Sequence, residues 1–293
     1  MEKIAGILAA VNRVLIGKEK TVTHLLTGIL CGGHLLIEDV PGTGKTTLAK
    51  AMAAVLGCSY KRIQFTPDLM PSDIIGLSIY DRKEGRFVFQ PGPVVSQFVL
   101  ADEINRTSPK TQAALLEAMA EKQVTVDGVT YPLPEAQLDR FMMCVSLGYP
   151  EADMEQLIVR LDPGRGLPAV LEKVVDAEEL VAMQKELAEV YLAAILEDYI
   201  VRLTRATRTH PDLLLGVSPR GGQYLYQASR ALAAVKGRDF VLPDDIKEIV
   251  PPVFSHRLIV KPEARLKGKT AAAILQEILL QTNVPVFIDD RVW

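Results

Sequence analysis

A glycine-rich loop that carries a lysine and two threonines is the part of this sequence with the clearest chemistry. It follows the apolar run Leu35-Leu36-Ile37 and reads Val40-Pro41-Gly42-Thr43-Gly44-Lys45-Thr46-Thr47. The backbone N–H groups of such a loop, together with the start of the next helix, bind phosphate oxygens, and glycines let the backbone approach closely. We expect Lys45 to reach the β- and γ-phosphates of ATP and the Thr46 hydroxyl to be a Mg²⁺ ligand. The alternative, an ordinary turn rich in glycine and threonine, agrees poorly with the strand and helix signals on either side.

Two acidic residues at the end of an apolar strand form the second candidate site. The strand Phe98–Ala101 is apolar, and Asp102 and Glu103 follow it directly. Asp102 would lie at the carboxyl end of a buried strand, where it can hold Mg²⁺. Glu103 can then polarise a water molecule for in-line attack on the γ-phosphate. By itself such a strand end is usually only solvated, but downstream of a phosphate loop it predicts an ATPase-type site.

Alternating strand and helix signals in the first half of the chain would position both groups. We expect a parallel sheet covered by helices, an α/β fold. The expected strands are His34–Asp39, Tyr60–Phe65, Phe98–Ala101 and Phe141–Leu147. The expected helices are the N-terminal segment to Val14, Lys45–Leu56 and Lys110–Lys122. Two hairpins, Leu77–Phe89 and Val124–Tyr131, interrupt the alternation, the second around the turn signal Asp127-Gly128.

The second half of the chain reads as a separate, helical unit. Strand signals stop at about Asp162, and helical periodicity follows. The expected helices are Ala177–Val190, Ala194–Thr209, Pro219–Lys236, Pro243–Val250 and Thr270–Gln281. We therefore expect a nucleotide-binding α/β domain over residues 1–162 and a small all-α lid domain over residues 163–293.

Composition narrows the functional classes. The chain has 293 residues and a net charge of −3, so it shows no electrostatic footprint for nucleic acid. No apolar run approaches membrane-spanning length, and Met1-Glu2-Lys3 lacks a signal-peptide pattern. Its three cysteines are odd in number and lie in apolar surroundings, which is typical of reduced thiols. We expect a cytoplasmic protein without membrane insertion.

Several longer stretches resemble the MoxR group of AAA+ ATPases, over nearly the whole chain. They are Arg62 to Gly76 (RIQFTPDLMPSDIIG), Ala101 to Arg106 (ADEINR), Pro134 to Phe141 (PEAQLDRF) and Gly216 to Arg220 (GVSPR). The general phosphate-loop pattern has glycine where this chain has Asp39. The segment Glu38-Asp39-Val40-Pro41-Gly42, however, resembles the phosphate loop of the MoxR group, so Asp39 is not unusual within that group.

The resemblance implies roles for further residues. Leu15-Ile16-Gly17 is similar to the segment that contacts adenine, although a helix end packed on the sheet would look the same. Arg140 resembles the arginine finger that reaches the γ-phosphate of the neighbouring subunit's nucleotide, with a surface salt bridge to Asp139 as the alternative. Arg220 resembles the second sensor, which couples the lid to the nucleotide; the alternative is an ordinary arginine at a helix start.

The resemblance also implies an assembly and a class of work. An arginine finger that acts on the nucleotide of a neighbouring subunit requires a ring of subunits. We expect this ring to be a hexamer that binds ATP and Mg²⁺. The implied work is chaperone-like remodelling or assembly of partner proteins, which in the resembling family often contain von Willebrand factor A domains. In that reading the hairpins face substrate or partner.

One segment of the family pattern is missing from this chain. In the family, an apolar strand that ends in a sensor asparagine separates the second hairpin from the arginine finger. Here Val129-Thr130-Tyr131-Pro132-Leu133 runs directly into Pro134. We hypothesise that the central strand was lost, in the gene or in its sequence assembly. Neither Asn105 nor Ser146 is an obvious substitute, so hydrolysis should be impaired.

Two alternatives from other classes therefore stay open. The first is a scaffold that binds ATP and assembles but hardly hydrolyses it, because the sensor strand is absent. The second is a nucleic-acid motor, which the charge and the lack of an appended basic module argue against.

Overall fold

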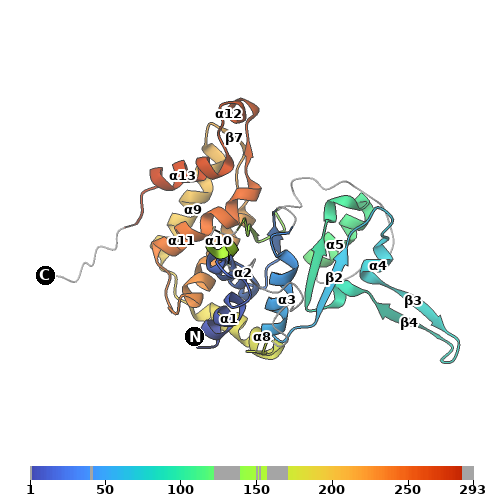
Figure 1. Ribbon diagram of the computed structural model, residues 1–293. Helices are drawn as coiled ribbons and strands as arrows, with labels where there is room; N and C mark the ends of the chain where they lie inside the picture. The colour runs from blue at the N-terminus through green and yellow to red at the C-terminus, as the bar shows by residue number, and fades with distance from the viewer. Residues whose placement is uncertain are drawn as a thin grey trace.

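The first half of the chain forms an α/β unit and the second half a helical lid (Figure 1). The computed structural model describes residues 2–39, 42–121, 139–149, 151, 153–156 and 171–285. Pro41, the predicted hairpin Val124–Tyr131, the join between Leu133 and Pro134 and the predicted domain boundary lie outside these residues. In the part of the chain that is described, no helix combines the length and apolarity needed to cross a membrane.

The α/β unit alternates helices and strands as the sequence predicts. Its elements are α1 (Glu2–Asn12), α2 (Glu19–Leu30), β1 (Leu35–Ile37), α3 (Lys45–Val55), β2 (Tyr60–Gln64), α4 (Pro71–Ile75), β3 (Gly76–Asp81), β4 (Arg86–Pro91), β5 (Phe98–Asp102), α5 (Pro109–Glu121) and β6 (Met143–Val145). The predicted hairpin is the antiparallel pair β3–β4, which projects from the body of the molecule (Figure 1).

The parallel strands form two separate pairs. β1 pairs with β6, and Leu35 lies opposite Met143. β2 pairs with β5, and Tyr60 lies opposite Phe98. Among the described residues no ladder joins β1 to β5, so the parallel sheet is divided into two halves. Every residue of β5 is half-buried, whereas a strand inside a helix-covered parallel sheet is normally fully buried.

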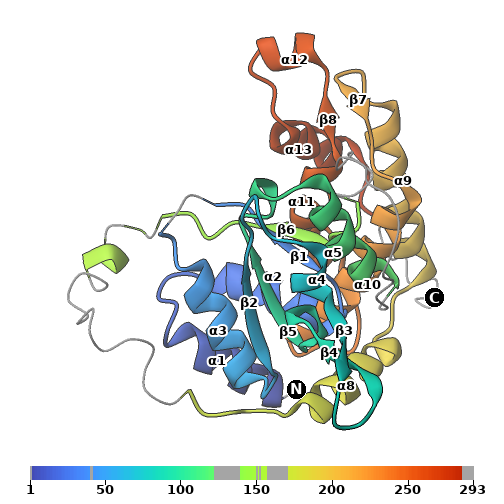
Figure 2. The same ribbon diagram turned by 90° about the vertical axis from the view of Figure 1, so that its right-hand side faces the viewer.

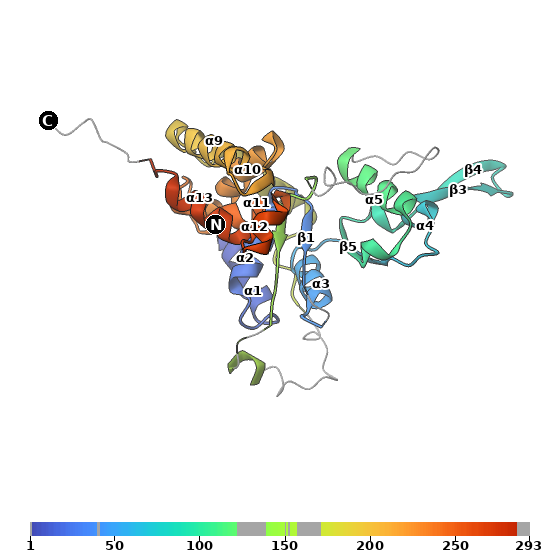
Figure 3. The same cartoon turned by 90° about the horizontal axis from the view of Figure 1, so that it is seen from above.

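Separate apolar cores accompany the divided sheet. Side chains of α1, α2 and α3, such as Leu26 and Met52, form one core. β2, α4 and α5 enclose a smaller one around Phe65 and Ile74. The elements of this smaller core stand to one side of α1 and α2 (Figure 3). Met142 and Met143 at β6 belong to a third core, which is that of the lid.

Amphipathic helices build the lid. Its elements, with the preceding α8, are α8 (Ala177–Glu186), α9 (Ala194–Thr209), β7 (Leu213–Leu215), α10 (Pro219–Val235), α11 (Pro243–Phe254), β8 (Ile259–Val260), α12 (Pro262–Leu266) and α13 (Ala271–Gln281). Tyr199, Leu232 and Phe254 are fully buried between them. The short antiparallel pair β7–β8 corrects our expectation that strands stop after Asp162. It lies with α12 at the end of the lid farthest from α1 (Figure 2).

α8 packs on the α/β unit and not on the lid core. Leu180 belongs to the core of α1–α3. Gln184 Nε2 donates to the Ile29 carbonyl oxygen of α2 at 2.8 Å. Just before α8, the Val174 N–H donates to the Val55 carbonyl oxygen at 2.9 Å. The lid core is therefore built by residues from Val190 onward, together with Met142 and Met143.

Candidate nucleotide site

The glycine-rich loop lies between β1 and α3, as the sequence predicts. Gly42 and Gly44 have φ values of 87° and 92°, in the left-handed region that favours glycine. Gly44 is the N-cap of α3 and offers no side chain to cap the first N–H groups of the helix. A Cβ at Gly42 would meet no atom within 4 Å, so the loop faces open space there. This arrangement of exposed N–H groups at a helix start suits a phosphate.

Asp39 holds the loop to the segment after β6. Its Oδ2 accepts hydrogen bonds from the Leu147 and Gly148 N–H groups at 2.6 and 2.9 Å. Lys18 Nζ donates to the carbonyl oxygens of the same segment, at 2.5 Å to Leu147 and 2.9 Å to Tyr149. A glycine at position 39 could not accept the hydrogen bonds from Leu147 and Gly148, which gives Asp39 a structural role where the usual loop pattern has glycine.

The residues that start α3 lie within reach of the loop. Lys45 Nζ donates to the Asp39 carbonyl oxygen at 2.8 Å, so the ammonium group lies against the loop backbone. Thr43, Thr46 and Thr47 are half-buried. The Thr46 hydroxyl and the Asp102 carboxylate are oxygen donors of the kind that Mg²⁺ prefers, so their chemistry fits the ion.

The acidic pair lies at the carboxyl end of β5 and is bound to neighbouring polar side chains. Asp102 Oδ2 accepts from Arg62 Nη2 at 2.6 Å. Glu103 Oε2 accepts from Gln64 Nε2 at 2.6 Å, and Glu103 Oε1 lies 3.2 Å from Arg106 Nη2. These partners lie on β2 and on the turn after β5.

Glu103 also has an unusual backbone. Its φ is 59°, which makes it the one non-glycine residue with a positive φ in the described part of the chain. Such a conformation costs about 1–3 kcal/mol and persists where the surroundings impose it, often at functional sites. No sequence pattern around Glu103 predicts this backbone conformation.

The predicted adenine segment lies beside the phosphate loop. Leu15 is buried, and its Cδ2 is 3.7 Å from the position that a Cβ on Gly44 would take. Gly17 has a φ of 72°, and a Cβ there would lie 2.9 Å from Met154 Cγ. Ile16 between them is half-buried. The structure therefore brings residues 15–17 close to the glycine loop.

Arg140 points into its own subunit. Its Nη1 donates to the Leu116 carbonyl oxygen of α5 at 2.7 Å. In this structure the neighbouring Asp139 is paired with Arg257, whose Nε lies 2.9 Å from Oδ1, and not with Arg140. No spacing signal could reveal the Asp139–Arg257 contact, because 118 residues separate its members.

Arg220 is exposed at the second position of α10, directly after Pro219. It makes no hydrogen bond or ion pair with the described residues. Its position at the start of a lid helix matches the resemblance and also the alternative of an ordinary helix-start arginine.

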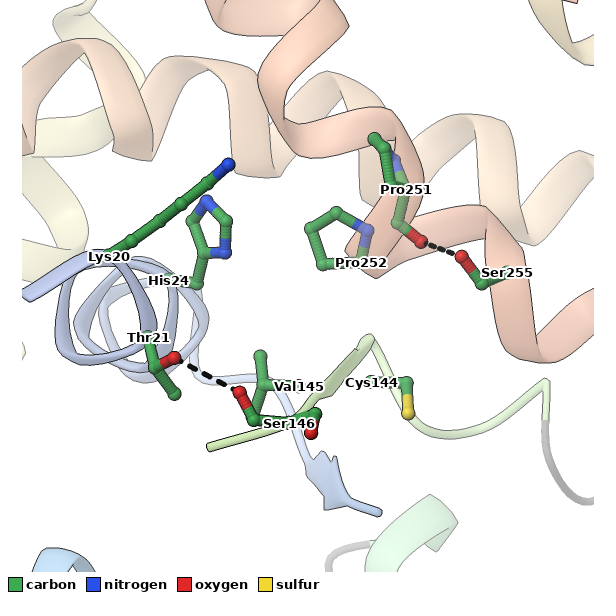
Figure 4. A pocket seen from close by; sticks show the side chains of 9 residues that line it. All are labelled: Lys20, Thr21, His24, Cys144, Val145, Ser146, Pro251, Pro252 and Ser255. Carbon is green, nitrogen blue, oxygen red and sulfur yellow. Dashed lines mark hydrogen bonds between the residues drawn. The ribbon is translucent and has the colours of Figure 1, made fainter. Parts of the chain in front are cut away.

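A cavity of about 290 Å³ lies elsewhere, between α2, β6 and α11 (Figure 4). Lys20, Thr21 and His24 from α2 face Pro251, Pro252 and Ser255 from the lid, with Cys144–Ser146 between them. No residue that the sequence assigns to ATP lines it. Burial, and next the nearby Glu38, raise the pKa of the Cys144 thiol to about 12, so this thiol stays protonated and unreactive.

Comparison with known proteins agrees with this architecture. A model of the ATPase family associated with various cellular activities (AAA) matches residues 34–130, and an AAA lid domain model matches residues 205–278. The chain is 36% identical to a protein named Chaperone MoxR1 of Mycobacterium tuberculosis, over 94% of this chain and 80% of that protein. It is 33% identical to Protein MoxR of Paracoccus denitrificans, over 87% and 88% of the two chains.

Two further relatives are similar over nearly their whole lengths. YeaC of Bacillus subtilis, which has no described activity, is 44% identical over 94% of this chain and 93% of its own. The crystal structure of a candidate ATPase from Cytophaga hutchinsonii is 36% identical and superposes with a TM-score of 0.88, covering 97% of this chain and 96% of that one. The alignments to YeaC and Chaperone MoxR1 run over 297 and 306 residues, longer than this 293-residue chain, so each relative has residues with no counterpart here. The family models, the relatives and the fold agree, and this chain belongs to the MoxR family of AAA+ ATPases.

Proposed function

We propose that this chain binds ATP with Mg²⁺ at the loop of residues 42–47 and hydrolyses it to remodel or assemble partner proteins. The observation that carries the proposal is the pair of left-handed glycines at the start of α3. Support also comes from a relative that is named a chaperone.

Each predicted site residue would contribute a separate part of the chemistry. The loop N–H groups and Lys45 bind the phosphates, while Thr46 and Asp102 hold Mg²⁺, which when bound neutralises charge on the phosphate oxygens. Glu103 orients and polarises the attacking water. Arg220 contacts the nucleotide from the lid.

Arg140 would complete the site of a neighbouring subunit, and for this reason we propose a homo-oligomeric ring, with six subunits as in our expectation from the family. To do so, the Arg140 side chain must leave the Leu116 carbonyl oxygen that it contacts here. We expect the ring in the cytoplasm. Its clients would be proteins, with von Willebrand factor A domain proteins as the first class to test.

The scaffold that binds ATP with little hydrolysis is the second candidate. It is favoured by the division of the parallel sheet between β1 and β5 and by the pairing of Asp102 with Arg62 and of Glu103 with Gln64. The relatives' additional residues agree with the hypothesis of a lost strand. In this form, the protein would assemble on ATP and release it slowly.

Steady-state ATP hydrolysis separates the two candidates. We expect the wild-type protein to turn over ATP and Glu103→Gln to lower kcat by about 10²-fold or more, because it removes the group that polarises water. A fluorescent ATP analogue measures binding in parallel, and Lys45→Ala serves as the control that weakens it. Binding without turnover above the Glu103→Gln background would select the scaffold. The absence of binding would contradict both.

A further inference from the structure

The buried guanidinium of Arg257 contacts the segment that carries Arg140. Arg257 lies in the turn after α11, and its side chain is 2% exposed. Its Nε donates to Asp139 Oδ1 at 2.9 Å, and its Nη2 donates to the carbonyl oxygens of Asp139 and Phe141 at 3.1 and 2.5 Å. Nη1 donates to the Met142 carbonyl oxygen at 3.3 Å. One lid side chain thus binds three residues on either side of Arg140, namely Asp139, Phe141 and Met142, through three carbonyl oxygens and one carboxylate.

Asp139 also contacts the start of the lid helix that carries Arg220. The Ser218 hydroxyl donates to Asp139 at 3.0 Å (Oδ1) and 2.9 Å (Oδ2). Ser218 is the N-cap of α10, and Arg220 is the second residue of that helix. The Asp139 carboxylate therefore joins the beginning of α10 to the end of α11.

Arg140 is held from the lid as well. The Tyr224 hydroxyl of α10 donates to the Arg140 carbonyl oxygen at 3.4 Å, and the Arg257 guanidinium lies over the Tyr224 ring at 5.2 Å. The Arg140 side chain extends the other way, to α5. Its backbone is thus fixed by lid residues, while its side chain is free to exchange one carbonyl acceptor for another partner.

From these contacts we infer that Asp139, Ser218 and Arg257 form a lid latch, which makes the placement of Arg140 depend on the position of the lid. This inference rests on the proposed roles of Arg220 at a subunit's own nucleotide and of Arg140 at the neighbour's. A lid movement set by the nucleotide at Arg220 then moves the start of α10, and Asp139 carries that movement to the adjacent Arg140. Arg257 is a positioning residue in this scheme and does not contact the nucleotide.

The burial of the latch favours a rigid link over a surface contact. A buried guanidinium that loses its carboxylate is left without compensation, so the latch does not open and close easily. The planar fork of arginine makes several directed hydrogen bonds at once, which a lysine at the same position cannot reproduce. Arg257→Lys therefore keeps the positive charge but cannot form the same set of directed hydrogen bonds.

The test uses the full-length chain with Glu103→Gln, so that ATP is bound without being consumed. ATP-dependent self-association is measured by sedimentation velocity, and ATP affinity by titration with a fluorescent analogue, for Arg257→Lys and for a matched control, Arg202→Lys. Arg202 makes an ion pair with Asp198 on α9, with a 38% exposed side chain. We expect Arg257→Lys to keep the ATP affinity within about threefold and to weaken ATP-dependent self-association at least tenfold, while Arg202→Lys changes neither.

A milder variant covers the case in which Arg257→Lys does not fold. Ser218→Ala removes one hydroxyl from the latch, and circular dichroism checks that it is folded. Ser218→Ala should also weaken ATP-dependent self-association, but by a smaller factor than Arg257→Lys. If both latch variants associate on ATP as the control does, the latch is only a packing contact and the inference is wrong. If the Glu103→Gln parent itself binds no ATP, the proposed function fails and the latch loses its premise.

Discussion

At the scale of single residues, Glu103 is the side chain whose surroundings bear most directly on turnover. Its carboxylate accepts from Gln64 and lies beside Arg106, while its backbone has a positive φ. Both partners compete with a water molecule for the same oxygens. In this conformation Glu103 is held away from the role that we propose for it, which is to polarise a water molecule.

Removing the amide of Gln64 should release Glu103. We expect Gln64→Ala to raise basal kcat severalfold, because a hydrogen bond to a charged group contributes about 1.5–3 kcal/mol and less where it is exposed, as here. Steady-state ATP hydrolysis measures the effect, with Gln90→Ala on the exposed β4 strand as the control. A fall in kcat for Gln64→Ala would mean that Gln64 positions Glu103 productively.

The sequence was enough to propose candidate site residues, but it could not predict their contacts. Glycine, lysine and threonine in one loop, and Asp102 after an apolar strand, are local patterns. Asp39 differs, because its partners Leu147 and Gly148 follow another strand and no periodicity connects them. The pairing of Glu103 with Gln64 likewise depends on the register of β2 against β5.

At the scale of elements, the start of α11 shows how one carboxylate fixes a lid helix. Asp245 has a side chain that is 1% exposed, and it accepts from both Nη atoms of Arg238 at 2.6 and 2.7 Å. It also accepts from the Leu242 N–H at 2.9 Å, which caps the helix. The adjacent Asp244 is 84% exposed.

This contrast gives a matched pair of variants. We expect Asp245→Ala to lower the free energy of unfolding by about 3–5 kcal/mol, because it leaves Arg238 without its buried partner. Asp244→Ala should cost less than about 1 kcal/mol, since it removes an exposed charge from the first helical turn and a surface ion pair with Lys247. Urea unfolding followed by circular dichroism measures both. Equal losses of unfolding free energy in the two variants would show that the Asp245–Arg238 ion pair contributes little to stability.

Long periodic elements were predictable, and short or irregular ones were not. The sequence places α9 at Ala194–Thr209, and the structure has the same bounds. Sequence patterns predicted neither α2 nor the short strands β7 and β8. These two strands have only two or three residues, which is too few for a periodic pattern to appear. The predicted end of α11 was Val250, but the helix continues through Pro251 and Pro252 to Phe254. The prolines are tolerated there because α11 is held by the apolar contacts of Val253 and Phe254 in the lid core.

At the scale of the whole molecule, His256 lies at the junction between lid and α/β unit, where its Nε2 is 3.0 Å from the Phe141 carbonyl oxygen. Burial, and next the neighbouring Arg257, lower the pKa of His256 from 6.5 to about 4. The folded chain therefore keeps this ring neutral while the unfolded chain takes up a proton below pH 6.5. Stability is lost as the pH falls from about 6.5 to about 4, by up to about 3 kcal/mol.

His256→Gln should flatten this pH dependence while leaving stability near pH 7 little changed. Burial lowers the pKa of His24 as well, so a smaller slope of the same sign should persist. Thermal unfolding between pH 4 and 7 measures the effect, with the wild-type protein as the reference. If the stability of His256→Gln depends on pH as steeply as that of the wild-type protein, His256 is not the source of this pH dependence.

The division into an α/β unit and a lid was predicted, because strand and helix periodicities change along the chain. The division of the parallel sheet was not predicted, because the sequence indicated only that a central strand is missing. Its effect on the cores, with Phe65 and Ile74 apart from the core of α3, could not be read from local patterns.

The separate small core has a consequence for folding cooperativity. The contacts between the unit of β2, α4, β5 and α5 and the rest of the described chain include those of β5 with α3, the packing of Phe98, and the hydrogen bonds of His34 and Arg140 to carbonyl oxygens of α5. A unit with its own core can open at a lower free energy than the whole protein. The phosphate loop belongs to one unit and the acidic pair to the other, so a nucleotide that contacts both would bind only the closed form. By mass action the bound nucleotide would then stabilise the closed form. It would hold the two units together in part, as a continuous sheet would do without a ligand.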